Sequence, residues 1–412
     1  MTTPPSFQYS TVTTETTLQA LQRDSDELIA IRRDIHQNPE LSFKEQRTSD
    51  LVAERLQGWG YEVSRGLGGT GLVGQLRRGD GKRRLGLRAD MDALPIKEET
   101  GLKYASRNTG VMHACGHDGH TAMLLGAAKA LADRGRFSGT LNLIFQPAEE
   151  YGKLDSGATR MMDDGLFERF PCDAIFGMHN MPGFPQGELV FRDGPMMASS
   201  DKVYITLTGH GGHGAAPHRA ADPVVAAASL VMALQTVVSR NVDPLETAVV
   251  TVGVLHAGTA NNVIPQNARL ELSVRALQPA VRELMRQRIT ELAHDHAKSF
   301  GVTAEVDYQQ GYAILINTTE ETEFARRVGV DLVGADKVML QGPPLTGSED
   351  FAFMLERRPG CYLLIGNGDG DSPGACMVHN PGFNFNDDNL VIGAAYWTSL
   401  AERFLQNAPR SA

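Results

Sequence analysis

The spacing of apolar and polar residues divides the chain into a helical start and a longer region of alternating strands and helices. From about Leu18 to Gly58 apolar residues recur at the period of amphipathic helices, with a break at Asn38-Pro39. Residues 1–16 are polar and are expected to be frayed. Farther along, apolar runs predict strands at 71–78, 84–90, 140–146, 173–178 and 187–192, and a helix at 121–134. This alternation favours an α/β structure around a largely buried sheet.

The pattern changes near Gly194-Pro195. From there we predict, in order, a strand, a helix, two strands, a helix and a strand, at 203–209, 222–238, 248–255, 268–275, 279–299 and 303–309. The order β-α-β-β-α-β is typical of a ferredoxin-like unit. After Gly311 the α/β pattern resumes, with a strand at 362–366. We therefore predict an α/β domain formed by residues 17–195 and 311–406 and interrupted by an inserted domain, residues 196–310.

Composition excludes several classes of protein. The 39 Lys and Arg residues against 49 Asp and Glu give a net charge of −10 with no long basic run, so nucleic acid and anionic membranes are poor partners. No run reaches the roughly 20 uninterrupted apolar residues of a membrane helix. The polar N-terminal stretch has neither the basic nor the apolar segment of a signal peptide. Because four cysteines are too few for a disulfide scaffold, a reducing cytoplasm is the predicted location.

Potential ligands and bases follow the predicted strands of the α/β region. Asp90, the pair Glu149-Glu150, His179 and His379 each come after a different apolar run. Ligands of open α/β sheets bind beyond the carboxyl ends of the strands. The sequence therefore predicts that these side chains meet at one edge of the sheet.

The densest group of candidate ligands is the segment 113–120, His-Ala-Cys-Gly-His-Asp-Gly-His. Thiol and imidazole groups in a short Gly-containing loop suit a divalent metal, so we predict Cys115 and His117 as ligands. The alternative is that Asp118 caps the following helix and the histidines are surface groups. We expect His113 and His120 to support the site rather than bind metal.

Glu149 and Glu150 form a like-charged pair at the rim of a core strand, which predicts different roles for the two carboxylates. One is expected to bind metal while the other faces the attacking water. Asp90 is expected to orient a ligand histidine, unless it is only a turn residue. The Gly- and His-rich segment 209–214 fits either a third metal segment or a substrate clamp.

These segments, in order, resemble the aminoacylase/carboxypeptidase metallopeptidase family, and within it the amidohydrolase branch of hippurate and indole-acetyl-amino-acid hydrolases. The resemblance covers roughly residues 25–405, and the ordered combination is far more specific than any single motif. The motifs are RADMDALP at 88–95, MHACGHDGH at 112–120, FQPAEE at 145–150, GMHN at 177–180, GGHGAAPH ending at His218, NNVIP at 261–265, GSEDF at 347–351 and HNP at 379–381.

The resemblance implies a mixed-sheet catalytic domain with an inserted lid and dimerisation domain, and two divalent ions, zinc or manganese. It implies Glu149 as the catalytic base and Asp90 as the carboxylate that orients the metal site. It also implies that His213 reaches the site of a partner subunit, with substrate contacts from Asn262 and Arg275. The implied metal ligands are Cys115, His117, Glu150, His179 and His379.

The implied reaction is hydrolysis of the amide bond of N-acyl amino acids, with the ions activating a water molecule and polarising the carbonyl. Dipeptidase-like members of the family carry a histidine two residues before the aspartate, where this chain has Arg88, which argues against a peptidase. An N-acetyl-amino-acid deacetylase and a catalytically silent binding protein remain alternatives. A zinc deaminase is disfavoured because no Pro-Cys-x-x-Cys motif occurs. The expected assembly is a homodimer or higher homo-oligomer formed through the inserted domain.

Overall fold

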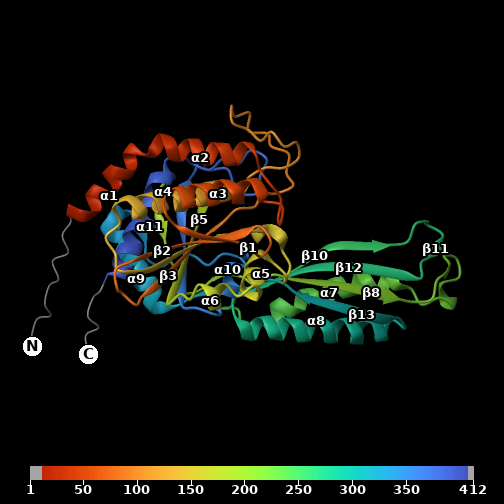
Figure 1. Cartoon of the computed structure of the whole chain (residues 1–412). Coiled ribbons are helices and arrows are strands. Elements are labelled where there is room, and N and C mark those ends of the chain that lie inside the picture. The colour runs from red at the N-terminus through yellow and green to blue at the C-terminus, as the bar shows by residue number, and fades with distance from the viewer. Residues whose placement is uncertain (1–11, 407–412) are drawn as a thin grey trace, which may run out of the picture.

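A computed structural model describes residues 12–406 and has two bodies that lie side by side (Figure 1). The larger body is built on an eight-stranded sheet in the order β1-β2-β4-β3-β5-β16-β6-β15. The β3/β4, β3/β5, β5/β16 and β6/β15 pairs are parallel and the other pairs antiparallel. The strands are β1 (Glu62–Leu67), β2 (Gly71–Arg78), β3 (Arg84–Asp90), β4 (Gly139–Gln146), β5 (Ala174–Pro182), β6 (Leu189–Val190), β15 (Val338–Met339) and β16 (Gly360–Gly368).

Helices cover both faces of this sheet, so its central strands are buried on both sides. The longer helices share one apolar core with the side chains of one face, including Leu85 and Leu87 of β3. They are α1 (Val12–Arg23), α2 (Ser25–Gln37), α3 (Gln46–Gly58), α4 (His117–Arg134), α9 (Thr319–Val333) and α11 (Asn389–Leu405). Shorter helices pack with Ile144 and Ile175 on the opposite face. They are α5 (Gly157–Asp163), α6 (Leu166–Arg169) and α10 (Phe351–Leu355).

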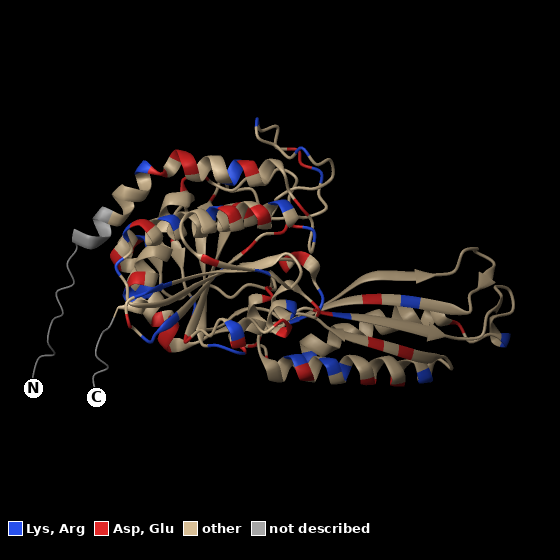
Figure 2. Cartoon of the chain, viewed as in Figure 1, with Lys and Arg blue, Asp and Glu red and all other residues tan. Residues whose placement is uncertain are grey.

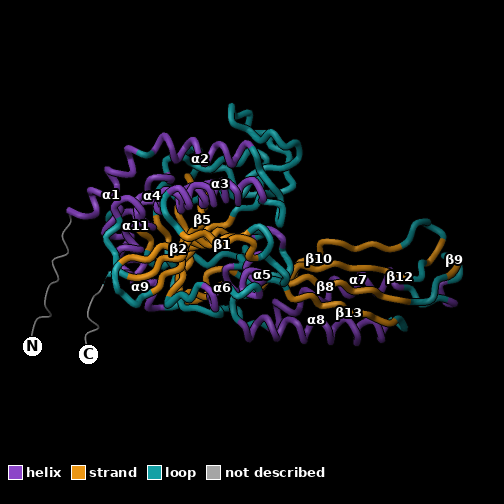
Figure 3. The backbone as a smooth tube through the Cα atoms, in the orientation of Figure 1, coloured by secondary structure: helices purple, strands orange, loops and turns teal. Residues whose placement is uncertain are grey.

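The smaller body, which we call the insert (residues 201–310), has a four-stranded antiparallel sheet in the order β10-β12-β8-β13. This is the strand order of a ferredoxin-like unit. Alternate strand residues such as Val203, Ile205 and Leu207 share an apolar core with two helices. Figure 3 shows these helices, α7 and α8, beside the small sheet. Its elements are β8 (Asp201–Thr208), α7 (Pro223–Asn241), β10 (Ala248–Ala257), β12 (Asn267–Ala276), α8 (Pro279–Ser299) and β13 (Thr303–Gln310). The short strands β9 (Gly212–His213) and β11 (Val263–Ile264) pair with each other at its far end.

One helix in the described part of the chain, α7, is long and apolar enough to cross a membrane by length and composition. One face of α7 packs on the sheet of the insert through Ala226, Ala227, Leu230 and Leu234, which are fully buried. Acidic and basic residues both occur along α2, α3 and α8 (Figure 2).

The predicted fold class is confirmed, including the mixed sheet and the ferredoxin-like insert. The domain limits 17–195, 196–310 and 311–406 stay a prediction. Near the two predicted boundaries, β7 (Gly194–Met197) pairs with β14 (Leu315–Asn317). The expected frayed start lies outside the described residues as far as residue 11, whereas α1 begins at Val12.

Candidate metal centre

The candidate ligands gather where the central strands of the large sheet end. Asp90 closes β3, His179 lies in β5, and His379 follows β16. Two non-glycine residues with left-handed backbone form sharp turns here: Ala148 (φ 51°), directly before the short helix η1 (Glu149–Tyr151), and His379 (φ 64°). The turns aim carboxylate and imidazole groups at one point beyond the sheet, as predicted for an α/β fold.

The first turn of α4 places the remaining candidates. Gly116 precedes it with a φ of 93°, and a Cβ at that position would come within 2.0 Å of Asn180 Oδ1, so glycine is required. The helix therefore begins at His117, four residues before the predicted start at Thr121. Both Cys115 and His117 are buried.

Two sets of ligand atoms share one thiol. Cys115, His117 and His179 form one set, and Cys115, Glu150 and His379 form the other; within each set the atoms lie within 4.8 Å of one another. Cys115 Sγ is 3.3 Å from His179 Nε2, and His379 Nε2 is 3.0 Å from Glu150 Oε1. The structure thus brings all the residues predicted as metal ligands together.

Glu149, the predicted base, points into the same place. Its side chain is buried, and its carboxylate lies within 4.8 Å of ligand atoms of His117 and Glu150. The Tyr312 hydroxyl donates to the Glu149 backbone carbonyl at 2.5 Å and so fixes the turn. The two adjacent glutamates therefore face different neighbours, as expected.

Asp92, which the sequence analysis did not single out, connects these parts. Its Oδ1 lies 3.2 Å from His117 Nδ1 and accepts the Glu149 backbone N–H at 3.0 Å. Its Oδ2 accepts the Glu150 N–H at 2.9 Å. A carboxylate on the far nitrogen of a ligand histidine fixes the tautomer and the ring orientation. Asp92 thus orients His117 and holds the Glu149-Glu150 turn together.

Asp90 contacts His120 and Arg88. Its Oδ1 lies 2.6 Å from His120 Nδ1 and its Oδ2 accepts from Arg88 at 2.6 Å. The ring of His117 is farther away, with Nε2 at 3.8 Å from Asp90 Oδ2. The orienting role of Asp90 stays a prediction, while the contact to the far nitrogen of His117 belongs to Asp92.

The electrostatics of the site favour a bound cation. Burial would lower the pKa of His117, but Asp90 and Asp92 outweigh it and raise that pKa to about 10. Burial, followed by the charges of Glu150 and Glu149, raises the pKa of the Cys115 thiol well above its usual range. The carboxylates that contribute to both shifts outnumber Arg88, the buried cation that pairs with three carboxylates of this region.

The residues also fit a metal chemically. His117 Nε2 is buried without a hydrogen-bond partner among residues 12–406, so this nitrogen can bind an ion once its proton has left. Thiolate, imidazole and carboxylate together form a donor set for zinc or a related divalent ion. Two sets that share Cys115 are consistent with two ions.

A cavity of about 600 Å³ opens over these ligands and extends to the insert. Five apolar residues line the cavity, here called its apolar wall, and the insert contributes the basic residues Arg275 and Lys202. Arg275 Nη1 donates to Ser348 Oγ at 3.1 Å, and no carboxylate forms a salt bridge with Arg275 in the described part of the chain. The apolar wall is formed by Met181, Met197, Leu345, Met377 and Val378.

Two predicted substrate contacts lie elsewhere. His213 lies in β9 and Asn262 just before β11; both are exposed, and neither lines the cavity. β11 and β9 lie at the end of the insert farthest from the large sheet (Figures 1 and 3). Within one chain the structure does not bring them to the metal centre.

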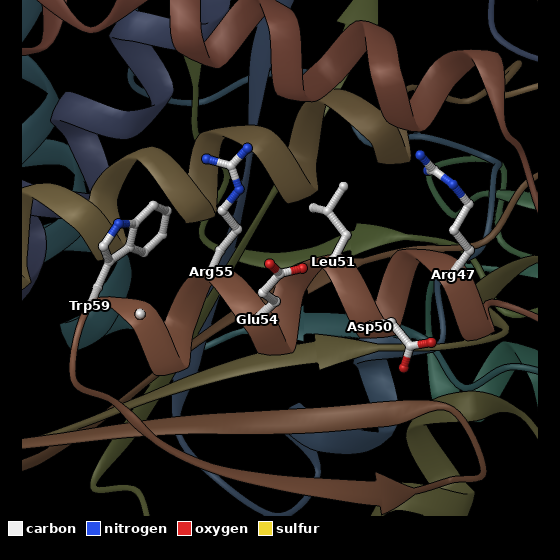
Figure 4. A pocket seen from close by; sticks show the side chains of 7 residues that line it. Arg47, Asp50, Leu51, Glu54, Arg55 and Trp59 are labelled. Carbon is white, nitrogen blue, oxygen red and sulfur yellow. The ribbon is translucent and has the colours of Figure 1, made fainter.

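Another hollow, of about 590 Å³, lies on the outer face of α3 between Arg47 and Trp59 (Figure 4). Its Arg47 and Arg55 form surface salt bridges to Asp34 and Glu27. None of its residues belongs to a potential metal-binding group of the described chain. This hollow therefore has no part in the chemistry of the site.

Comparison with known proteins agrees with this geometry. Residues 86–403 match the model of peptidase family M20/M25/M40. The chain belongs to this family. It is 44% identical to hippurate hydrolase of Campylobacter jejuni over 91% of this chain and 96% of that one. It is 38% identical to N-acetyl-L-cysteine deacetylase of Bacillus subtilis, over 93% and 90% of the two chains.

A solved structure resembles the fold as a whole. The YxeP protein of Bacillus subtilis, described as a dinuclear metal-binding peptidase of the M20 family, superposes with a TM-score of 0.81 at 32% identity, covering 95% of this chain and 99% of that one. The predicted family and the expectation of a metal-dependent hydrolase are confirmed. An M20 site with these ligand sets holds two metal ions.

Proposed function

We propose that this M20 protein hydrolyses the amide bond of N-acyl amino acids that have a bulky, apolar acyl group. The observation that carries the proposal is one cavity over the two ligand sets that is also lined by the buried base Glu149 and by Arg275, a guanidinium with no salt bridge in the described chain. The hippurate hydrolase and deacetylase relatives bear out the predicted class of substrate.

Each residue has a chemical role in this reaction. When bound, the two ions make water a better nucleophile and polarise the scissile carbonyl. Glu149 takes a proton from the attacking water and delivers it to the leaving nitrogen. The ligands are Cys115, His117, Glu150, His179 and His379. The thiolate favours zinc, whereas the imidazole and carboxylate ligands also suit manganese. A reducing cytoplasm is the proposed location because Cys115 must remain a free thiol, as it is here.

The methionine-rich wall predicts a preference for aromatic over acetyl groups. We expect kcat/KM for N-benzoylglycine to exceed that for N-acetylglycine by about 10–200-fold, because each apolar group buried in such a pocket contributes about 1–3 kcal/mol. Initial rates with the zinc- or manganese-loaded protein across N-acetyl, N-hexanoyl and N-benzoyl glycine measure this. A preference for the acetyl compound would instead support a deacetylase of amino-acid biosynthesis.

Arg275 is proposed to bind the carboxylate of the amino acid. Replacing it with alanine is expected to raise KM for N-benzoylglycine by about 10- to 100-fold, since hydrogen bonds to charged groups contribute about 1.5–3 kcal/mol. N-benzoylglycinamide, which has no carboxylate, is the matched control, and its KM should rise much less in the same variant. An equal loss with both compounds would contradict this role.

We also propose a homodimer that forms through the insert. β10 is an edge strand of the small sheet, and edge strands readily pair with another chain. Val225 and Met232 on α7 are 53% and 71% exposed, and Val254 and Leu255 on β10 are also exposed. Such a dimer would allow His213 and Asn262, remote from the site of their own chain, to contact substrate in the partner's cavity.

Mixing two inactive variants tests this arrangement. His213→Ala and Glu149→Gln are each expected to be nearly inactive alone. In a heterodimer of the two, the His213→Ala chain keeps Glu149 and receives His213 from its partner. Random exchange at equal amounts should therefore restore about one quarter of wild-type activity, because about half the dimers are mixed and each has one intact site. If activity does not recover after verified subunit exchange, or if the protein sediments as a monomer, the proposed dimer is contradicted.

A further inference from the structure

A second glutamate faces the predicted base. Glu349 lines the cavity above the metal centre and is only 2% exposed. Carboxylate oxygens of Glu149, Glu349 and Asp350 lie within 4.8 Å of one another. Glu349 comes from the GSEDF segment, to which the proposed reaction assigns no chemistry. It is therefore an acidic group beside the reacting atoms that has no assigned role.

The Glu349 carboxylate is held firmly but retains one free acceptor position. Its Oε1 accepts from Arg88 Nη2 at 2.8 Å and from the Phe351 backbone N–H at 3.0 Å. Its Oε2 accepts from the Tyr362 hydroxyl. Each carboxylate oxygen has two lone pairs, so Oε1 is fully used and Oε2 can accept one more hydrogen bond. Arg88 and Tyr362 are buried on β3 and β16, which makes the position rigid.

The pair of glutamates lacks a positive charge between its members. Arg88 forms salt bridges with Asp90, Glu349 and Asp350, but no Lys or Arg within residues 12–406 forms one with Glu149. Two carboxylates this close are stable together only if a proton or a cation joins them. During amide hydrolysis such a cation forms in the cavity, because the leaving amine becomes an ammonium group.

The order of groups along the cavity matches the order of atoms in the substrate. An N-acyl amino acid runs from the scissile carbonyl through the amide nitrogen and Cα to the carboxylate. Glu149 lies beside the metal ligands, and Ser348 lies beside Arg275, the proposed carboxylate binder. Glu349 follows Ser348 in the chain, and its carboxylate lies within 4.8 Å of that of Glu149. A substrate that extends from the metal ligands to Arg275 would therefore carry its nitrogen past Glu349.

We propose that Glu349 is a catalytic residue that accepts a hydrogen bond from the substrate amide N–H and stabilises the leaving amine as an ammonium ion. Water supplies both protons. Glu149 passes the first to the nitrogen while the C–N bond breaks and its electron pair stays on nitrogen. The second leaves the new carboxylic acid and completes the ammonium. The inference rests on the proposed reaction and on the proposed role of Arg275.

An ester analogue separates this role from a structural one. O-benzoylglycolate has the shape of N-benzoylglycine, but its leaving group is an alcohol that carries no N–H and forms no cation. Glu349→Gln is expected to lower kcat/KM for the amide by about 100-fold, the scale of a lost charge-assisted contact in a transition state, and to lower ester hydrolysis much less. Inhibition by the product glycine should weaken as well.

Asp350→Asn is the matched control. Asp350 also pairs with Arg88, at 3.2 Å, but does not line the cavity, so any loss should be equal for the amide and the ester. If Glu349→Gln does not fold, Glu349→Asp is measured in the same way and should shift the amide-to-ester ratio in the same direction. If the ratio of kcat/KM for the amide to that for the ester is unchanged in the folded, metal-loaded Glu349 variant, the inference is overturned. Failure of the wild-type protein to hydrolyse N-benzoylglycine would instead overturn the proposed function.

Discussion

Glu149→Gln is expected to lower kcat for N-benzoylglycine by about 10²–10⁴-fold, the contribution of a well-placed proton-transfer group. Glutamine has the same shape and preserves the buried turn, whose backbone N–H and carbonyl groups bond to Asp92 and Tyr312. It cannot take a proton from water. The loss should therefore appear in kcat with little change in KM.

The adjacent residue is the control for this prediction. Glu150 belongs to a metal-ligand set, so Glu150→Gln is expected to weaken metal binding, whereas Glu149→Gln should keep its full metal content. Metal analysis after dialysis, together with single-turnover rates, separates the two outcomes. Glu149→Gln retaining more than about a tenth of wild-type kcat would exclude the base role.

Much of the fold could be predicted from the sequence because its periodic patterns are strong and local. The βαββαβ order of the insert and the bounds of α8, Pro279–Ser299, follow from alternating strands and a charged amphipathic helix. The bounds of some elements differ from the prediction. The strand predicted at 187–192 is only β6, Leu189–Val190. The start of α4 at His117 depends on a left-handed Gly116 that contacts Asn180, a tertiary effect beyond any local pattern.

The site was predictable as far as its residues follow strands and carry distinctive ligand chemistry. The residues that arrange the ligands were harder to find. Asp90 and Asp92 follow the same strand two residues apart, and only the fold reveals which of them reaches His117 Nδ1. The contact between Arg88 and Glu349 joins residues 261 positions apart, so no spacing rule indicates it. The motif GSEDF contains Glu349 and contributes to the family resemblance, but its sequence indicates no chemical role for this glutamate.

Removing the shared thiol is expected to have the second large effect. Cys115 belongs to both ligand sets, so Cys115→Ala should weaken the binding of both ions and abolish activity at micromolar metal concentration. Even changes to groups that only orient metal ligands cost about 10–100-fold in affinity, so loss of a shared ligand should cost at least about 100-fold. Chelation of the wild-type protein should also abolish activity, and zinc or manganese should restore it.

Cys376 provides the matched control for the thiol. It lies three residues before His379 but in neither ligand set, and it is half-buried and free. Cys376→Ala should therefore retain metal and turnover. Because metal binding requires the Cys115 thiolate, and burial beside Glu150 raises the pKa of that thiol, loading should release a proton that the Cys115→Ala variant does not release. Calorimetry in buffers of different ionisation enthalpy measures that proton. Full activity after exhaustive chelation, or equal metal content in Cys115→Ala and wild type, would contradict a centre built around Cys115.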